Sequence, residues 1–243
     1  MIGASNQRGA DKEHMPYFKK LGIFVRIPVA GEVKTRLVPP LEPWEACDLY
    51  KAFLEDLFSR LSKLKKVAGT VFYTGGGPAG IRTIIPDRFA LVPQEGETLG
   101  ERLLNAFRIL LRDEGSFAAI IGSDSPDIPL TYLKRAYLKL KHRDIVLGPA
   151  FDGGYYLIAM KSVIPGVFRD IAWSEPRVLG DTLARIEKDA LTCATLPLWY
   201  DVDDPRSLSL LESVLVAKRI EKSDRLPSTE RVLAAIRDRQ EGK

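Results

Sequence analysis

The stretch FAAIIGSDSPD, residues 117–127, joins five apolar residues to a loop that carries two aspartates. A fully apolar run this short is typical of a strand in the middle of a parallel sheet, where both faces are buried. Asp124 therefore follows a buried strand, a position suited to a carboxylate that binds Mg²⁺. Because Ser and Asp also make turns and cap helices, a purely structural role for this loop is the alternative.

Segments of strand character and segments of helical periodicity alternate along the rest of the chain. Strands are expected at residues 21–26, 67–73, 89–92, 117–121, 144–147, 155–160 and 191–198. Helices are expected from Pro43 onward, at residues 99–111, 130–141, 177–188 and 205–218, and in a last short helix capped by Ser228. The alternation predicts a three-layer α/β/α fold with a mainly parallel central sheet, whose ligands bind beyond the carboxyl ends of the strands.

One domain, residues 21–243, is expected to follow a mobile N-terminal extension, residues 1–20. The extension has no apolar central region, so it does not read as a secretory signal, and Met15 offers an alternative translation start. No run of about 18–20 uncharged apolar residues predicts a membrane span.

The composition is that of a globular protein. Of 243 residues, 45% are hydrophobic and 28% charged, which excludes disorder, collagen and coiled coil. The net charge of +4 is small and dispersed and does not predict nucleic-acid binding. Cys47 and Cys193 lie far apart in the sequence, so we expect each to be buried and reduced, in a cytoplasmic protein without a zinc site.

The loop after the first expected strand, RIPVAGEVKTR at residues 26–36, gathers three cations and a hydroxyl around one glycine. Backbone N–H groups of a glycine loop and guanidinium groups together suit a polyphosphate. The loop is neither a P-loop nor a dinucleotide fingerprint, and a solvated basic turn is the alternative. Its candidate binding residues are Arg26, Pro28, Gly31, Lys34, Thr35 and Arg36.

A second loop, residues 94–102, leads into a helix with two glycines at its start. Glycines there let a flat ligand or a phosphate approach the backbone, although Thr98 also suits a simple N-cap. The candidate binding residues are Gln94, Gly96, Gly100 and Arg102.

A second acidic cluster, Asp201, Asp203 and Asp204, follows the last expected strand. Asp201 and Asp203 are two residues apart, so in an extended chain both point the same way and could share a metal with Asp124. Asp204 precedes Pro205 and is expected to cap the following helix.

The loop GPAFDGGYY, residues 148–156, carries one carboxylate and two glycines between two strands. Asp152 is a candidate for holding an acceptor substrate, with Gly153, Gly154 and Tyr155 beside it, and a plain β-turn is the alternative. Trp173 either borders the same pocket or is a packing residue.

Together these loops resemble a bacterial family labelled nucleotide-diphospho-sugar transferases or GT-A-type glycosyltransferases of unassigned substrate. The resemblance spans residues 21 to 210 and rests on six blocks in order: R-x-P-x-x-G-x-x-K-T-R-L from Arg26, Q-x-G-x-x-L-G-E-R from Gln94, G-S-D-S-P-D from Gly122, G-P-A-x-D-G-G-Y-Y from Gly148, W-S from Trp173 and D-V-D from Asp201. More distantly, the layout is similar to molybdenum-cofactor and phospholactate guanylyltransferases.

The resemblance implies a GT-A fold that binds a nucleotide in its first half and an acceptor in its second. Lys34 and Arg36 would hold phosphates, helped by Arg26, and residues 94–100 would line the base or ribose. Asp124 and Asp203, with Asp201, would carry Mg²⁺ or Mn²⁺. Thr98 stands where the family pattern has an acidic residue.

Two reactions fit this reading, with Asp152, Lys34 and Arg36 as catalytic residues. In nucleotidyl transfer an acceptor phosphate attacks the α-phosphorus of a nucleoside triphosphate; in glycosyl transfer Asp152 activates an acceptor hydroxyl against a nucleotide-sugar. A nucleotide-binding module without catalysis is the alternative from another class. The C-terminal helices could equally close a homodimer or cover the sheet.

Overall fold

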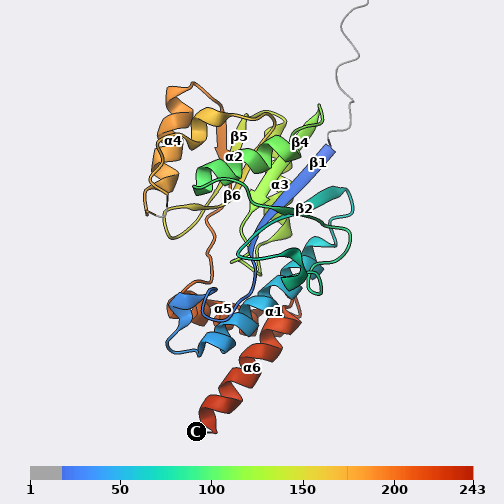
Figure 1. Ribbon diagram of the computed structural model, residues 1–243, viewed down its shortest axis with the longest axis vertical. Coiled ribbons are helices and arrows are strands. Elements are labelled where there is room, and N and C mark those ends of the chain that lie inside the picture. The colour runs from blue at the N-terminus through green and yellow to red at the C-terminus, as the bar shows by residue number, and fades with distance from the viewer. Residues whose placement is uncertain (1–17, 174, 243) are drawn as a thin grey trace, which may run out of the picture.

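The computed structural model describes residues 18–173 and 175–242 (Figure 1). The first strand begins at Phe18, so residues 18–20 belong to the sheet and not to the expected extension. The remainder of that extension, Met15 included, lies outside the described residues.

A single sheet of seven strands runs through the described part of the chain, in the order β3-β2-β1-β4-β6-β5-β7. The strands are β1 (Phe18–Arg26), β2 (Val67–Thr74), β3 (Ala90–Pro93), β4 (Ser116–Ile121), β5 (Ile145–Pro149), β6 (Tyr155–Met160) and β7 (Cys193–Thr195). All neighbouring pairs are parallel except those that β6 makes with β4 and β5. The predicted mainly parallel sheet is therefore confirmed.

Strand register brings the candidate loops to one edge of the sheet. Arg26 at the end of β1 pairs with Thr74 at the end of β2, and β4 ends beside them at Ile121. Because β6 runs in the opposite direction, its first residues lie at this same edge, where Leu157 pairs with Ile121. The turn before β6 thus meets the loops that follow β1, β2, β3 and β4.

Helices cover both faces of the sheet, as a three-layer fold requires. They are α1 (Pro43–Leu61), α2 (Leu99–Leu110), α3 (Leu130–Leu140), α4 (Val178–Lys188), α5 (Pro205–Ile220) and α6 (Pro227–Glu241). Alternate strand residues face two cores: Ala119 and Ile121 pack with α1, α3, α5 and α6, while Ala118 and Ile120 pack with α2 and α4. Among the described residues, no helix has the length and apolarity to cross a bilayer.

Three details differ from the sequence-based expectation. The last strand covers only Cys193–Thr195, because Pro197 in the following segment has no N–H to donate to a ladder. Cys47 is buried as expected, but Cys193 is only half-buried, and both are free thiols.

The third difference is at the last helix. α6 begins at Pro227 and is not capped by Ser228. Instead, the Asp56 side chain of α1 accepts hydrogen bonds from the backbone N–H groups of Ser228 at 3.1 Å and Thr229 at 2.7 Å. A carboxylate from a distant helix thus satisfies this helix end and docks α6 on α1 (Figure 1).

Candidate active site

A buried ammonium group lies at the centre of the site. Lys34 Nζ donates to Asp124 Oδ1, to Asp203 Oδ1 at 2.7 Å and to the backbone oxygen of Val202 at 2.7 Å. The Lys34 side chain is 2% exposed, whereas those of Asp124 and Asp203 are 41% and 43% exposed. Burial lowers the pKa of Lys34, but the two carboxylates outweigh burial and raise it, so the lysine is charged.

The loop after β1 delivers Lys34 to this position. Gly31 has φ +81, and Lys34 itself has φ +51, a left-handed conformation that is costly for a side chain other than glycine. The 3-10 helix η1 (Thr35–Leu37) follows and places Leu37 in the core. This backbone turns the lysine inward, under the carboxylates.

The loop after β4 fixes Asp124 by burying its neighbours. Ser123 Oγ lies 2.8 Å from Tyr50 Oη, Ser125 Oγ donates to Tyr200 O at 2.8 Å, and Asp127 accepts from Tyr200 Oη at 2.8 Å. The side chains of Ser123, Ser125 and Asp127 are thus buried, whereas the side chain of Asp124 faces the site. Its backbone oxygen accepts from Val202 N at 2.8 Å, which ties this loop to the second acidic segment.

Asp201 and Asp203 do not share one role. Asp203 binds Lys34, whereas Asp201 accepts a hydrogen bond from Ser125. Burial, with the negative charge of Asp124, raises the pKa of Asp201 to about 7. The predicted trio of metal ligands therefore does not converge as a single cluster within the described residues.

Three adjoining hollows surround Asp203, and each contains predicted site residues. The β1–β4 hollow, of about 220 Å³, is lined by Arg26, Lys34, Gln94, Asp124 and Asp203, together with Glu32, Thr74, Tyr50 and Ser123. The β6 hollow, of about 450 Å³, is lined by Arg36, Asp152, Gly154, Tyr155, Trp173, Asp201 and Asp203, among others.

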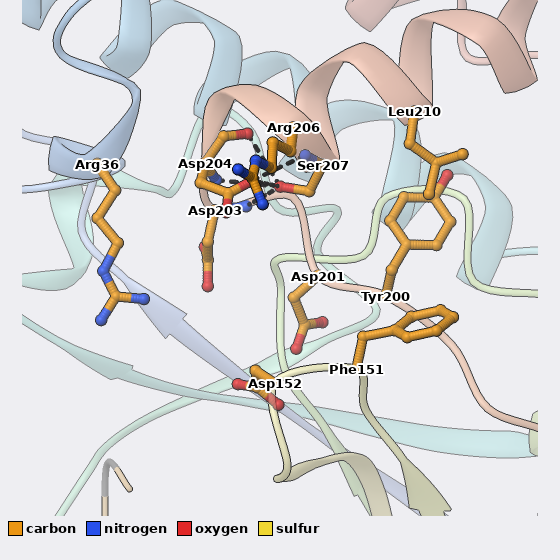
Figure 2. Close-up of a pocket in the computed structure, with 10 residues that line it drawn as sticks. All are labelled: Arg36, Phe151, Asp152, Tyr200, Asp201, Asp203, Asp204, Arg206, Ser207 and Leu210. Atoms are coloured by element: carbon orange, nitrogen blue, oxygen red, sulfur yellow. Dashed lines mark hydrogen bonds between the residues drawn. The ribbon is translucent and has the colours of Figure 1, made fainter. Parts of the chain in front are cut away.

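The α5 hollow, of about 370 Å³, shares Arg36, Asp152, Asp201 and Asp203 with the β6 hollow. Figure 2 shows Arg36 and Asp203 on one side of it and the apolar side chains of Phe151 and Leu210 on the other. The β1–β4 hollow shares Asp203 with the other two, so all three meet at this carboxylate at the carboxyl edge of the sheet, and we refer to them together as the groove.

The cations of the first loop differ in what they contact. Arg26 lies 3.7 Å from Glu32, both half-exposed, and Lys34 is engaged by two carboxylates. Arg36 has no ion pair with any described residue and points into the groove (Figure 2). Of the three predicted phosphate-binding cations, Arg36 alone is free to bind an anion without losing a partner.

Several predicted binding residues stabilise loops instead of lining the groove. Pro28, Gly31 and Thr35 line none of the three hollows. Arg102 Nε donates to Gly96 O at 2.9 Å, and Thr98 caps α2 through Glu101 N at 3.2 Å. Gln94 lines the β1–β4 hollow, but its side-chain amide donates to Phe72 O at 2.9 Å.

Gly100 has a packing role. A Cβ atom there would lie 2.7 Å from the Trp173 ring, so glycine lets the indole pack on the start of α2. Trp173 thus both borders the β6 hollow and packs against a helix. Packing is thus observed, while a role for Trp173 beside an acceptor stays a prediction.

The turn before β6 is rigid. Asp152 Oδ1 accepts from Gly154 N at 2.9 Å, and Ala150 N donates to Gly154 O at 3.0 Å. Gly153 has φ +88, and a Cβ there would lie 1.8 Å from Pro176 O, so only glycine fits. Both the β-turn and the placement of Asp152 in the groove are therefore observed.

Sequence reasoning did not identify Tyr50, a buried residue of α1, as part of the site. Its hydroxyl accepts from Arg26 N at 3.2 Å, and its ring lies 5.7 Å from Lys34 Nζ, as does that of Phe53. The available signal was a tyrosine hydroxyl on an otherwise apolar helix face that lies toward the carboxyl ends of the strands. Phe151 was also missed, although it is 69% exposed beside the groove.

The residues present fit a divalent cation. Asp124 and Asp203 already hold a positive charge between them, and Mg²⁺ is bound in proteins through one or two carboxylates. The position they share is taken by the Lys34 ammonium, so a metal and this lysine would compete for it.

Comparisons with known proteins identify a family and a fold for this chain. The family model described as "Uncharacterized protein conserved in bacteria (DUF2064)" matches residues 56–175. The chain is 31% identical to a structure described as a "putative nucleotide-diphospho-sugar transferase" from Desulfovibrio desulfuricans G20, covering 92% of this chain and 98% of that one, with a TM-score of 0.82. No curated protein sequence matches.

More distant structures share the fold alone. A CMP:2-keto-3-deoxy-manno-octonic acid synthetase complexed with CTP is 12% identical over 82% of this chain and 99% of its own, with a TM-score of 0.51. A 4-diphosphocytidyl-2C-methyl-D-erythritol synthase from Anaerococcus prevotii is 10% identical over 81% of this chain and 96% of its own, with a TM-score of 0.53. The chain therefore belongs to the bacterial DUF2064 family and has the nucleotide-diphospho-sugar transferase fold.

Proposed function

We propose that the protein is a transferase that uses a nucleoside triphosphate or a nucleotide-diphospho-sugar as donor, with Mg²⁺ or Mn²⁺, and a small-molecule acceptor. The observation that carries the proposal is the cation-holding pair Asp124 and Asp203, with Arg36 free beside it in one groove. A nucleoside triphosphate is the first donor to test, since the synthetase of the same fold binds CTP.

Each hollow then has a part in the reaction. The β1–β4 hollow receives the nucleotide, with Arg26 at its rim and Gln94 at its wall. Arg36 binds the phosphate oxygens and stabilises the negative charge that grows on them during transfer. A divalent cation held by Asp124 and Asp203 would supply further positive charge to those oxygens.

The acceptor lies on the β6 side of the groove. Asp152, held by its bond to Gly154 N, is placed to orient an acceptor group and to take its proton, and Trp173 and Tyr155 form a wall of that hollow. Lys34 Nζ, once released from the carboxylates, would be available to donate to a phosphate oxygen.

The test is a binding screen followed by product analysis. Nucleoside triphosphates and nucleotide-sugars are added with Mg²⁺, Mn²⁺ or EDTA, and unfolding temperatures are compared; a ligand at 100 times its Kd stabilises by about 2.7 kcal/mol. Release of pyrophosphate identifies nucleotidyl transfer, and release of nucleoside diphosphate identifies glycosyl transfer.

Asp124→Asn is the matched variant for this test. It should abolish the metal-dependent part of the shift while leaving the fold intact. Nucleotide binding without turnover for any acceptor would favour the non-catalytic module, and no binding by folded protein would overturn the proposal.

A further inference from the structure

Another hollow, separate from the three that make up the groove, lies at the opposite edge of the sheet and is surrounded by lysines. Its volume is about 250 Å³, and its lining is Lys19, Lys63, Leu64, Lys65, Lys66, Val67, Leu133, Lys134 and Tyr137. Five of these nine residues are lysines and none is acidic. We propose that this hollow, the lysine hollow, binds a small phosphorylated molecule that carries more than one negative charge.

The lysine hollow is remote from the groove. Lys19 and Val67 pair at the start of β1 and β2, while the groove lies beyond Arg26 at the other end of β1. Seven residues of strand separate the two places, which corresponds to about 23 Å. In Figure 1, β1 starts at the upper end of the sheet and runs down toward α1 and α5. A ligand here is therefore distinct from the proposed donor and acceptor.

Four of the five lysines around this hollow form no ion pair within the part of the chain that the structure describes. Lys63 lies 3.5 Å from Asp224, a carboxylate that also binds Arg60. Lys19, Lys65, Lys66 and Lys134 form no ion pair with any described residue. By contrast, Lys20, Lys51 and Lys161 elsewhere on the surface each pair with an aspartate. Clustered, unpaired charges of one sign focus the field in a cavity and attract a multivalent anion.

The backbone that presents these lysines is held in place. Arg88 donates to Ser62 O at 2.7 Å, Leu64 O at 3.2 Å and Val67 O at 3.1 Å, so one guanidinium clamps the turn that carries Lys63, Lys65 and Lys66. The backbone of this turn is therefore fixed before a ligand arrives, which reduces the backbone entropy lost on binding.

The floor determines the kind of ligand. Leu133 and Tyr137 are buried, and the Tyr137 hydroxyl donates a hydrogen bond to the backbone oxygen of Lys20 at 2.8 Å. The Lys19 ammonium lies 5.9 Å from the centre of the Tyr137 ring. The floor thus offers apolar contact and no free hydroxyl, so recognition falls to the ammonium groups, which bind phosphate oxygens as point charges.

The experiment titrates the isotope-labelled full chain with pyrophosphate at about 0.15 M salt, where weak surface attraction is screened, and follows backbone amide shifts. We expect shifts at residues 63–67 and 133–137, separate from any at residues 26–37 of the groove. Lys66→Gln with Lys134→Gln should weaken binding at the lysine hollow at least about fivefold. Lys188→Gln with Lys222→Gln, a matched pair of exposed lysines, should not.

A second arm identifies the source of the phosphate. Cosedimentation with phosphatidylcholine vesicles only when they contain phosphatidylserine, lost in the Lys66/Lys134 variant, would assign the lysines to an anionic membrane surface and overturn the proposal; pyrophosphate binding without cosedimentation would support it. Shifts confined to residues 26–37, no binding in either arm, or equal weakening by the control pair would overturn the proposal. Melting curves of both variants check that the fold is retained.

Discussion

Lys34 Nζ lies 2.7 Å from Asp203 Oδ1, although 169 residues separate the two in sequence. The same ammonium is also bound to Asp124, so a single lysine offsets one of the two negative charges that these carboxylates bring to the site. Under the proposed function, donor binding and metal binding would therefore both depend on where this side chain lies.

Replacing Lys34 by Met should strengthen metal binding in the absence of nucleotide. The substitution keeps the length of the buried stem but removes the charge, which leaves two carboxylates in need of a cation. We expect the affinity for Mn²⁺ alone to rise about tenfold, or about 1.4 kcal/mol, as measured from free Mn²⁺ by electron paramagnetic resonance. Lys51→Met, at an exposed pair with Asp48, is the control. Unchanged or weaker Mn²⁺ binding would contradict the competition.

Arg36 and Arg26 should differ in their effect on nucleotide affinity. Arg36 is unpaired in the groove, so Arg36→Gln removes a charge-assisted contact and should weaken nucleotide binding about tenfold or more. Arg26 already lies near Glu32, and Arg26→Gln should cost less. Isothermal titration measures both, and a larger loss for Arg26 would refute this order.

Most of the fold could be predicted from the sequence because each element has its own local pattern. The helix expected from Pro43 onward corresponds to α1, which begins at Pro43, and the apolar run 117–121 corresponds to β4, which begins one residue earlier at Ser116. Asp204 and Thr98 cap α5 and α2 as expected, since capping is decided within three residues.

The candidate site could be predicted only in part. Sequence placed Lys34, Asp124 and Asp203 at one sheet edge, where the lysine is predicted to bind phosphate and the aspartates a metal, but it gave no sign that the lysine contacts both carboxylates. Whether an ammonium or a divalent ion lies between two carboxylates depends on the path of the chain over more than 160 residues, which no local pattern records. The lysine hollow escaped notice for the same reason: β1, the turn after α1, and α3 each contribute only part of it.

Asp56→Ala should loosen α6. The Asp56 carboxylate is the acceptor for two N–H groups at the start of this helix, and losing such a cap costs about 1–2 kcal/mol locally. Hydrogen exchange of residues 227–241 should accelerate while that of β4 stays unchanged. Ser228→Ala is the matched control and should have little effect, because its side chain does not cap the helix.

Asp144→Asn should show a pH-dependent loss of stability. Hydrogen bonds from the Thr192 hydroxyl at 2.6 Å and backbone N–H at 2.9 Å, with Lys161, lower the pKa of Asp144 to about 2. Its unfolded value is about 3.9, so the ionised carboxylate stabilises the fold fully above that pH and loses its effect as pH falls toward 2.

Urea unfolding measures this effect. At neutral pH the Asn variant should be less stable by roughly 1 kcal/mol, a figure that allows for partial exposure of the carboxylate. The difference from the wild type should shrink as the pH falls from about 5 toward 2. A difference that stays constant with pH would mean that the carboxylate charge contributes nothing.

The reversed direction of β6 has a consequence for how family members can diverge. The turn at residues 150–154 joins neighbouring antiparallel strands, and the Phe151 side chain at its tip is exposed, so a change of that side chain leaves the register of the parallel strands untouched. The loops that hold Lys34, Asp124 and Asp203 are instead bound to one another by backbone and side-chain contacts. Altered side chains should therefore accumulate at position 151 among homologues, while the three charged residues stay invariant.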